Sequence, residues 1–80
     1  MAELQVDFES EGVVTFYYSN GDDRYALVTP TDGKVAERIY VDRKCMKKSN
    51  IRSLSKGVRV KCRGAHKERG PAAKRVEVLS

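Results

Sequence analysis

The sequence has no tryptophan, only two cysteines and a single histidine among its 80 residues. Cys45 and Cys62 are too few for a disulfide scaffold, and together with His66 they match no zinc-binding pattern. The chain also lacks a glycine-rich phosphate loop of the Walker type and any catalytic constellation. We therefore expect no enzyme activity, no cofactor and no bound metal.

Signals for targeting or membrane insertion are missing as well. No run approaches the ~20 apolar residues that a membrane span needs. Met1–Gln5 lack a basic start followed by an apolar run, so we expect no signal peptide. Unpaired cysteines fit the reducing cytoplasm, which is the expected location. The chain has room for one domain, residues 1–80, which we expect to be a monomer that does not bind membranes.

Each half of the chain is poor in charges of one sign. Residues 1–42 contain nine acidic and three basic side chains, whereas residues 43–80 contain thirteen basic and two acidic ones, for a net charge of +5. A strongly basic half on a small domain suggests a polyanionic partner, most often nucleic acid. The alternative is a solvated surface that only keeps the protein in solution.

Glycines and prolines separate short runs that are rich in β-branched and aromatic residues, a pattern typical of strands joined by turns. The predicted strands are Val13–Tyr18, Arg24–Thr29, Arg38–Asp42, Val58–Cys62 and Lys74–Leu79. Lys44–Lys56 is expected to be a long polar connection, and no segment has the 3.6-residue period of a long helix. Residues 1–11 are either a loose acidic arm or, because Leu4, Val6 and Phe8 alternate, an extension of the first strand.

Alternation within these runs assigns one buried face to each strand. Val58, Val60 and Cys62 share a face, as do Ile39 and Val41. Closing such strands into a barrel removes the exposed edges of a small open sheet. The prediction is an all-β fold, a small five-stranded OB-type Greek-key barrel, in which the long connection joins the third and fourth strands.

Several segments, in order and at suitable spacing, resemble one known family. They are Gly12–Tyr17, Arg24–Pro30, Ile39–Arg43, Ser53–Leu54, Gly57–Val60 and Arg69–Ala73. The first is similar to Gly-x-Val-Lys-Trp-Phe, the second to Gly-Phe-Gly-Phe-Ile-x-Pro, the third to Val-Phe-Val-His-Phe and the last to Lys-Gly-Pro-x-Ala. These are the motifs of the cold-shock domain family, and the resemblance spans roughly residues 12–79.

The resemblance implies a protein that binds single-stranded RNA or DNA as a nucleic-acid chaperone or as a regulator of transcription or translation. Members of the family stack bases on exposed aromatic rings while basic side chains follow the backbone. The residues expected to stack are Phe16, Tyr25, Tyr40 and Arg43. Those expected to contact bases or phosphates are Arg24, Asp42, Lys44, Lys47, Lys48, Arg52 and Arg69.

The departures from the family pattern fall mostly on its binding positions. Smaller or differently charged residues stand there: Thr15, Phe16, Asp23, Leu27, Asp42, Arg43 and Ile51. Asp42 would repel phosphate, yet its carboxylate can accept a hydrogen bond from the amino group of cytosine or guanine. A guanidinium plane at Arg43 also stacks on bases. The resemblance therefore implies the fold more directly than the activity.

Two other functions fit the same residues. One is a protein-interaction module that docks on a polymerase, ribosome or nuclease, with Tyr17, Tyr18, Leu27 and Tyr40 as anchors. Alternatively, binding of nucleic acid is purely electrostatic, through basic side chains such as Lys47 and Lys48.

Several individual side chains also have two interpretations. Phe8, Tyr17 and Tyr18 belong either to the core or, for Tyr17 or Tyr18, to the stacking surface, depending on how the strand bends. Arg59, Lys61 and Arg63 are expected on a solvated strand face, and His66 in a solvated loop. Cys62 is expected in the core, whereas Cys45 is either half-buried or, if exposed among lysines, a reactive thiolate.

Overall fold

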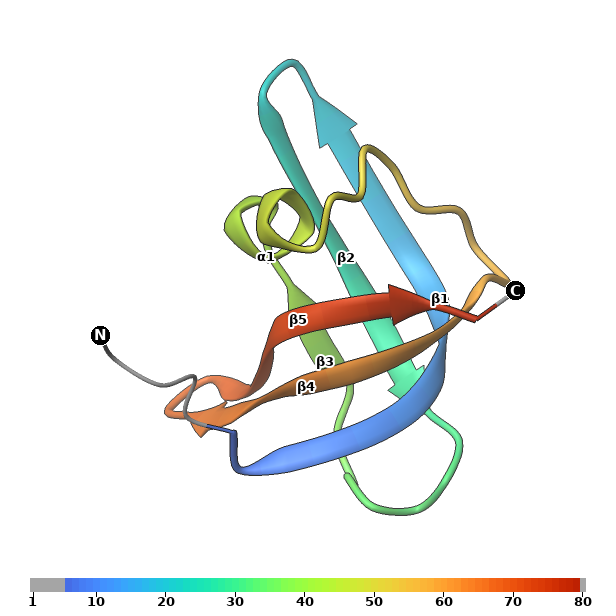
Figure 1. The fold of residues 1–80 in the computed structure, drawn as a ribbon, viewed down its shortest axis with the longest axis vertical. Coiled ribbons are helices and arrows are strands. Elements are labelled where there is room, and N and C mark those ends of the chain that lie inside the picture. Colours follow the sequence, from blue (N-terminus) through green and yellow to red (C-terminus); the bar gives the residue numbers. More distant parts are fainter. Residues whose placement is uncertain (1–5, 80) are drawn as a thin grey trace.

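The computed structural model describes residues 6–79, and these form a closed five-stranded barrel (Figure 1). Its elements are β1 (Phe8–Asn20), β2 (Asp23–Pro30), β3 (Ile39–Val41), α1 (Arg43–Lys48), β4 (Arg59–Lys67) and β5 (Gly70–Val78). The strands follow the order β1-β2-β3-β5-β4, and β4 returns to β1. Only β3 and β5 pair in parallel. The predicted OB-type barrel is confirmed.

Alternate residues of each strand fill the barrel, as the sequence pattern predicts. Ile39, Val41, Val60 and Cys62 are fully buried, with exposed fractions of 0%. Their neighbours in the chain point outward, which is why Tyr40 is exposed beside two buried residues. The inward set of β2 consists of Ala26 and Val28. The core thus leaves the outer face of β2 and β3 free for other side chains.

β1 is longer than predicted, because it begins at Phe8 rather than Val13. Residues 8–11 pair with β4, so they are strand and not a loose arm, while Leu4 lies outside the described residues. Gly12 pairs with Pro30 on one side and Val60 on the other. A Cβ at Gly12 would lie 2.5 Å from the carbonyl oxygen of Thr29, so only glycine fits at this position between β2 and β4.

β4 and β5 also extend beyond their predicted ends and meet in a turn at residues 68–69. His66 is therefore an exposed strand residue, not a loop residue, and its ring lies 5.3 Å from that of Phe8. The sequence did not predict the extension of β4, because Gly64 and Ala65 have low strand propensity. The tight packing of Gly64 against β5 explains why a glycine stands there.

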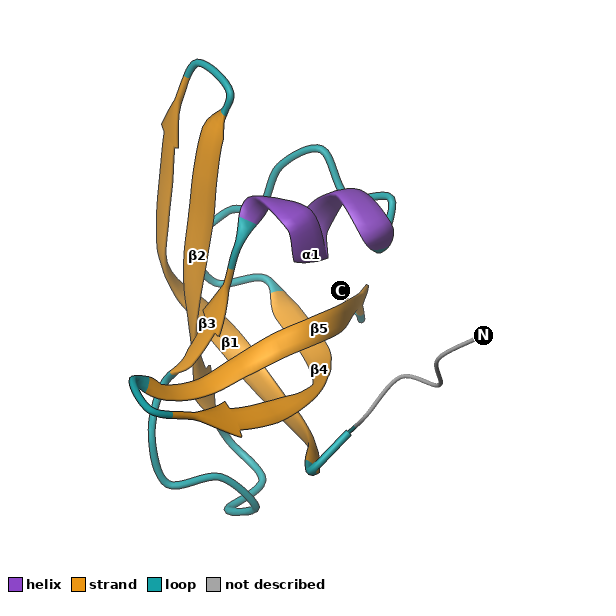
Figure 2. Ribbon diagram, turned by 90° about the vertical axis from the view of Figure 1, so that its left-hand side faces the viewer, coloured by secondary structure: helices purple, strands orange, loops and turns teal. Residues whose placement is uncertain are grey.

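The connection after β3 begins with a helix of six residues, α1, which the sequence did not predict. Asp42 caps it, since its Oδ1 accepts from the backbone N–H of Cys45 at 2.8 Å. Cys45 and Met46 are buried, and the helix ends near Asn50, which adopts a φ of 61°. Figure 2 shows α1 between the β1–β2 hairpin and β5. No helix within residues 6–79 is long and apolar enough to cross a membrane.

Candidate nucleic-acid interface

Four aromatic rings from three adjacent strands gather on the outer surface of the barrel. Tyr25 of β2 lies 5.7 Å from Phe16, 5.2 Å from Tyr18 and 5.7 Å from Tyr40, measured between ring centroids. The planes are tilted by 30° to 35° rather than perpendicular. We call Phe16, Tyr18, Tyr25 and Tyr40 the aromatic platform. Such a layer offers ring faces to flat, apolar ligands.

A β-bulge between Val14 and Phe16 places the β1 rings on this platform. Before the bulge the even-numbered residues of β1 point inward, and Val14 is buried. After it the odd-numbered Tyr17 packs against the core, so Phe16 and Tyr18 point outward. Of the two tyrosines that the sequence left open, Tyr18 therefore belongs to the platform. No local sequence signal marks the bulge, because it depends on pairing with β2.

The rings differ in how much surface they offer. Phe16 is 39% exposed and Tyr40 43% exposed, whereas Tyr18 and Tyr25 are partly buried. In the strand register Leu27 pairs with both Phe16 and Tyr40, so it lies between them. Burial raises the pKa of Tyr40, and the negative charges of Asp42 and Asp23 raise it further. Phe16 and Tyr40, on either side of Leu27, are thus the most accessible rings of the platform.

Arg43 and Lys44 lie beside the Tyr40 end of the platform. Together with Tyr40 and Asp42 they line a hollow of about 550 Å³ near the tip of the β1–β2 hairpin. Nη1 of Arg43 donates to the carbonyl oxygen of Asp22 at 3.3 Å, which holds the guanidinium near that tip. The structure therefore brings Arg43 and Lys44 next to the expected stacking residue Tyr40.

Arg24 is placed differently from the sequence expectation. It alternates with Tyr25 along β2, so its Cβ points to the opposite face of the strand. Its Nη1 donates to the carbonyl oxygen of Arg52, and its Nε is buried without a partner among residues 6–79. Arg24 thus fastens the β1–β2 hairpin to the connection that follows α1. A phosphate contact by Arg24 would compete with this role.

The remaining basic side chains lie around the aromatic platform rather than on it. Lys47 and Lys48 are exposed on α1, and Arg52 is exposed in the following connection. None of the three lines either hollow that borders Tyr40. Arg69 occupies the β4–β5 turn and does line the larger of these hollows. Of the predicted contact residues, Asp42 lines both hollows, Arg24 and Lys44 line the smaller one, and Arg69 lines the larger one.

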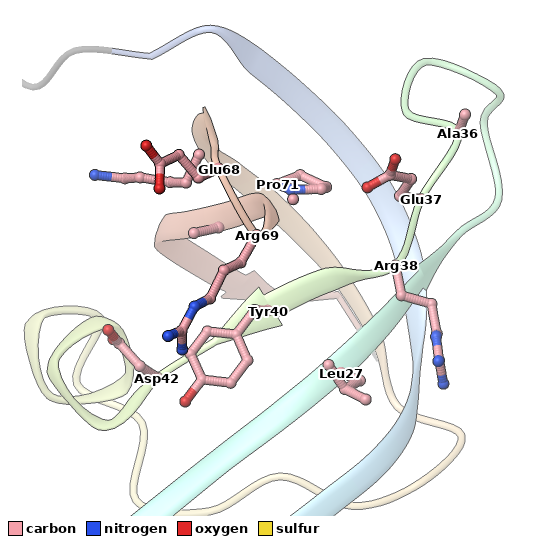
Figure 3. A pocket seen from close by; sticks show the side chains of 12 residues that line it. Leu27, Ala36, Glu37, Arg38, Tyr40, Asp42, Glu68, Arg69 and Pro71 are labelled. Atoms are coloured by element: carbon pink, nitrogen blue, oxygen red, sulfur yellow. The ribbon is translucent and has the colours of Figure 1, made fainter.

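The larger hollow is a groove of about 1150 Å³ between the β2–β3 loop and the β4–β5 turn (Figure 3). Tyr40, Asp42 and Leu27 form its side next to the platform. Arg69 extends toward Tyr40 and Asp42 from the turn, while Arg38 and Glu37 border the loop side. The sequence reasoning did not select Arg38 or Glu37, because only the closed barrel brings their loop beside the β4–β5 turn.

Basic side chains of β4 form ion pairs with acidic side chains of β1. Glu9 pairs with Lys61 at 3.0 Å and with Arg63 at 2.8 Å, and Glu11 lies 4.0 Å from Arg59. The hydrogen bond from Lys61 and the nearby charges lower the pKa of Glu9. These pairs offset part of the positive charge on the outer face of β4, in agreement with the interpretation of a solvated strand face.

Both cysteines are buried and lack thiolate character. Burial raises the pKa of Cys45 from 9.0 to about 11 and that of Cys62 to about 12. The reactive-thiolate interpretation of Cys45 is therefore wrong, because the helix turns this side chain into the core, away from the lysines. The core position of Cys62 is confirmed.

Comparisons with models of protein families, with curated proteins and with solved structures gave no match. The resemblance to the cold-shock family therefore stays a prediction from the sequence.

Proposed function

We propose that this chain binds single-stranded RNA or DNA by stacking bases on the aromatic platform. The observation that supports this most is the spacing of four rings at 5.2 Å to 5.7 Å across β1, β2 and β3, with Phe16 and Tyr40 exposed. Stacking on aromatic side chains is worth ~1–3 kcal/mol per base and tolerates every base, since each has a π-face.

Phosphates would be met on two sides of Tyr40. Arg43 and Lys44 stand beside Tyr40 at the hairpin side, and Arg69 stands beside it at the groove side. These basic side chains can follow the phosphate backbone of a strand whose nucleobases lie on the rings. A base stacked on a protein ring is unavailable for a duplex. The expected role is therefore to hold strands unpaired, as a nucleic-acid chaperone or a regulator of transcription or translation does.

Replacement of Tyr40 by alanine tests this function most directly. We expect Tyr40→Ala to weaken binding of a short unstructured strand by roughly ten- to a hundredfold, the loss of one stacked base. Fluorescence anisotropy measures the affinity. Tyr40→Phe is the matched control and should bind nearly as well as the unmodified protein, because the ring face remains. Unchanged affinity in a folded Tyr40→Ala variant would rule out stacking at this position.

A second candidate is a protein partner that docks on the same platform. The acids beside Tyr40 favour this candidate, because Asp23 and Asp42 line the hollow at the hairpin tip and their charges repel phosphate. A variant with both Tyr25→Ala and Tyr40→Ala separates the two functions. A docking module would keep its affinity for nucleic acid and lose its protein complex, whereas a stacking protein would lose strand binding.

Purely electrostatic binding makes a different prediction. Charge reversal at Lys47 and Lys48 should then weaken binding far more than loss of the tyrosines does. Both lysines lie outside the two hollows beside Tyr40, so stacking predicts the opposite ranking.

A further inference from the structure

An acid and a base, Asp42 and Arg69, both line the groove beside Tyr40, and no ion pair joins them. Asp42 follows the end of β3, and Arg69 reaches in from the β4–β5 turn (Figure 3). Among residues 6–79 neither forms an ion pair with any other side chain. The exposed ring of Tyr40 lines the same groove. A flat ligand on this ring would therefore meet an acceptor and a donor at its edges.

Asp42 keeps hydrogen-bonding capacity for such a ligand. Its Oδ1 accepts from the backbone N–H of Cys45 at 2.8 Å, which fixes the carboxylate at the start of α1. A carboxylate has about four acceptor sites on its two oxygens, so the cap uses only one of them. Asp42 is partly exposed and lines the groove, and its remaining sites are open to a bound group.

The turn constrains the backbone next to Arg69. Gly70 follows it with a φ of 118°, a conformation that other residues avoid, and Pro71 is buried. A Cβ at Gly70 would lie 3.1 Å from Oε2 of Glu37, so the turn and the β2–β3 loop are in close contact there. The groove is thus built from two anchored segments.

We propose that this groove selects a guanine in the bound strand, an inference that rests on the proposed nucleic-acid function. Guanine is the one standard base whose pairing edge carries two adjacent donors, N1–H and the N2 amino group, which match a carboxylate. Its O6 and N7 are two adjacent acceptors, which match an arginine fork. Tyr40 would stack on its face, Asp42 would accept from N1–H and N2, and Arg69 would donate to O6 and N7.

The other bases fit this arrangement less well. Adenine and cytosine offer a single amino group to the carboxylate. Uracil and thymine place a carbonyl oxygen on each side of their one N–H, and Asp42 would repel both oxygens. The inference gives a chemical reason for the departure from the family pattern at Asp42. The aspartate lowers the general affinity for nucleic acid and adds a preference for guanine.

Base analogues test each contact separately. Short thymidine strands carry one central guanine, adenine, inosine, which lacks the N2 amino group, or 7-deazaguanine, which lacks N7. We expect the unmodified protein to bind the guanine strand roughly tenfold more tightly than the adenine strand, the range of one well-placed base contact. Inosine and 7-deazaguanine should each lose part of this advantage.

Three variants assign the contacts to residues. Asp42→Asn keeps the helix cap, since asparagine caps as well as aspartate, and should remove the difference between guanine and inosine. Arg69→Gln should remove the difference between guanine and 7-deazaguanine. Glu77→Gln removes a carboxylate charge outside both hollows beside Tyr40 and is the matched control, which should keep both differences.

The outcomes separate this inference from the proposed function. Equal affinity for all the strands would overturn guanine selection and leave single-strand binding intact. A full guanine preference in folded Asp42→Asn would overturn the assignment of the carboxylate. No binding of any strand would overturn both the inference and the proposed function.

Discussion

At the scale of single residues, one extra residue in β1 determines which rings reach the platform. The bulge between Val14 and Phe16 reverses the facing of the strand, so that Phe16 and Tyr18 join Tyr25 on the outside. The hydroxyl of Thr15 lies 3.0 Å from that of Thr29, which ties the bulge to β2. Without this reversal Tyr17 would point outward in their place.

Gly64 is a residue at which any side chain should damage the barrel. A Cβ there would lie 2.8 Å from the Cα of Ala73 and close to the carbonyl oxygen of Ala72. We expect Gly64→Ala to lower the free energy of unfolding by about 1–3 kcal/mol, the usual cost of overpacking. Urea denaturation measures it, with the exposed Ser53→Ala as control. Equal stability of the two variants would contradict the close approach of β4 and β5.

The two buried thiols should make the fold sensitive to alkali. Their pKa values are raised from 9.0 to about 11 for Cys45 and about 12 for Cys62, so the folded state favours the neutral thiols. This stabilisation is complete below pH 9.0 and declines as the pH rises toward about 11. Urea midpoints at increasing pH measure the decline, and Cys45→Ala should flatten it. An identical alkaline decline in Cys45→Ala would contradict burial of that thiol.

At the scale of elements, the β2–β3 loop is anchored to β1 by Asp32. Its carboxylate accepts from the backbone N–H of Glu11 at 2.8 Å, from the hydroxyl of Ser10 at 2.7 Å and from the N–H of Lys34 at 3.1 Å. The same loop forms one side of the groove. The anchor therefore holds Glu37 and Arg38 in place next to the β4–β5 turn.

Acid should release this anchor at a low and measurable pH. The hydrogen bonds, led by that of the Glu11 N–H, lower the pKa of Asp32 from 3.8 to about 2. The contribution of the anchor is complete above pH 3.8 and is lost as the pH falls through about 2. The amide shift of Glu11 in NMR spectra should titrate with that midpoint, and Asp32→Asn should abolish the titration. A midpoint near 3.8 would show that the anchor is absent.

The sequence predicts the centres of the strands better than their ends. Alternation is strong where inward β-branched residues fill the barrel, as at Ile39, Val41 and Val60, and those predictions are confirmed. It is weak at Gly64 and Ala65, where close backbone packing replaces side-chain burial. The six residues of α1 are too few to show a helical period.

The candidate site was predictable only in part, for a related reason. Phe16, Tyr25 and Tyr40 could be selected from alternation and the family resemblance, and the structure brings them together. Tyr18 depended on a bulge, and the groove depended on two loops that are distant in the chain. Arg24 has a basic side chain suited to phosphate and lines the hollow near the hairpin tip, but its guanidinium donates to the carbonyl oxygen of Arg52, a contact that the sequence did not predict.

At the scale of the whole molecule, the basic side chains differ in whether they have acidic partners and in whether they line the hollows beside the platform. Two acidic side chains of β1 form ion pairs with three basic side chains of β4, whereas the exposed lysines of α1 lack acidic partners among the described residues. The hairpin of β1 and β2 extends beyond the barrel (Figure 1). Tyr18 and Tyr25 are paired across its two strands. A polyanion would thus be attracted by one region and held by another, and salt should weaken the first contribution more than the second.

The central claim is that bases stack on the platform, and an NMR titration tests it most directly. A short mixed-sequence single strand is added at low and at moderate salt while backbone amide shifts are followed. The expected result is a cluster of shifts at Phe16, Tyr18, Tyr25–Leu27 and Tyr40–Arg43 that persists at moderate salt. Shifts confined to Lys47 and Lys48 that vanish with salt, or no shifts at all, would contradict stacking as the mode of binding.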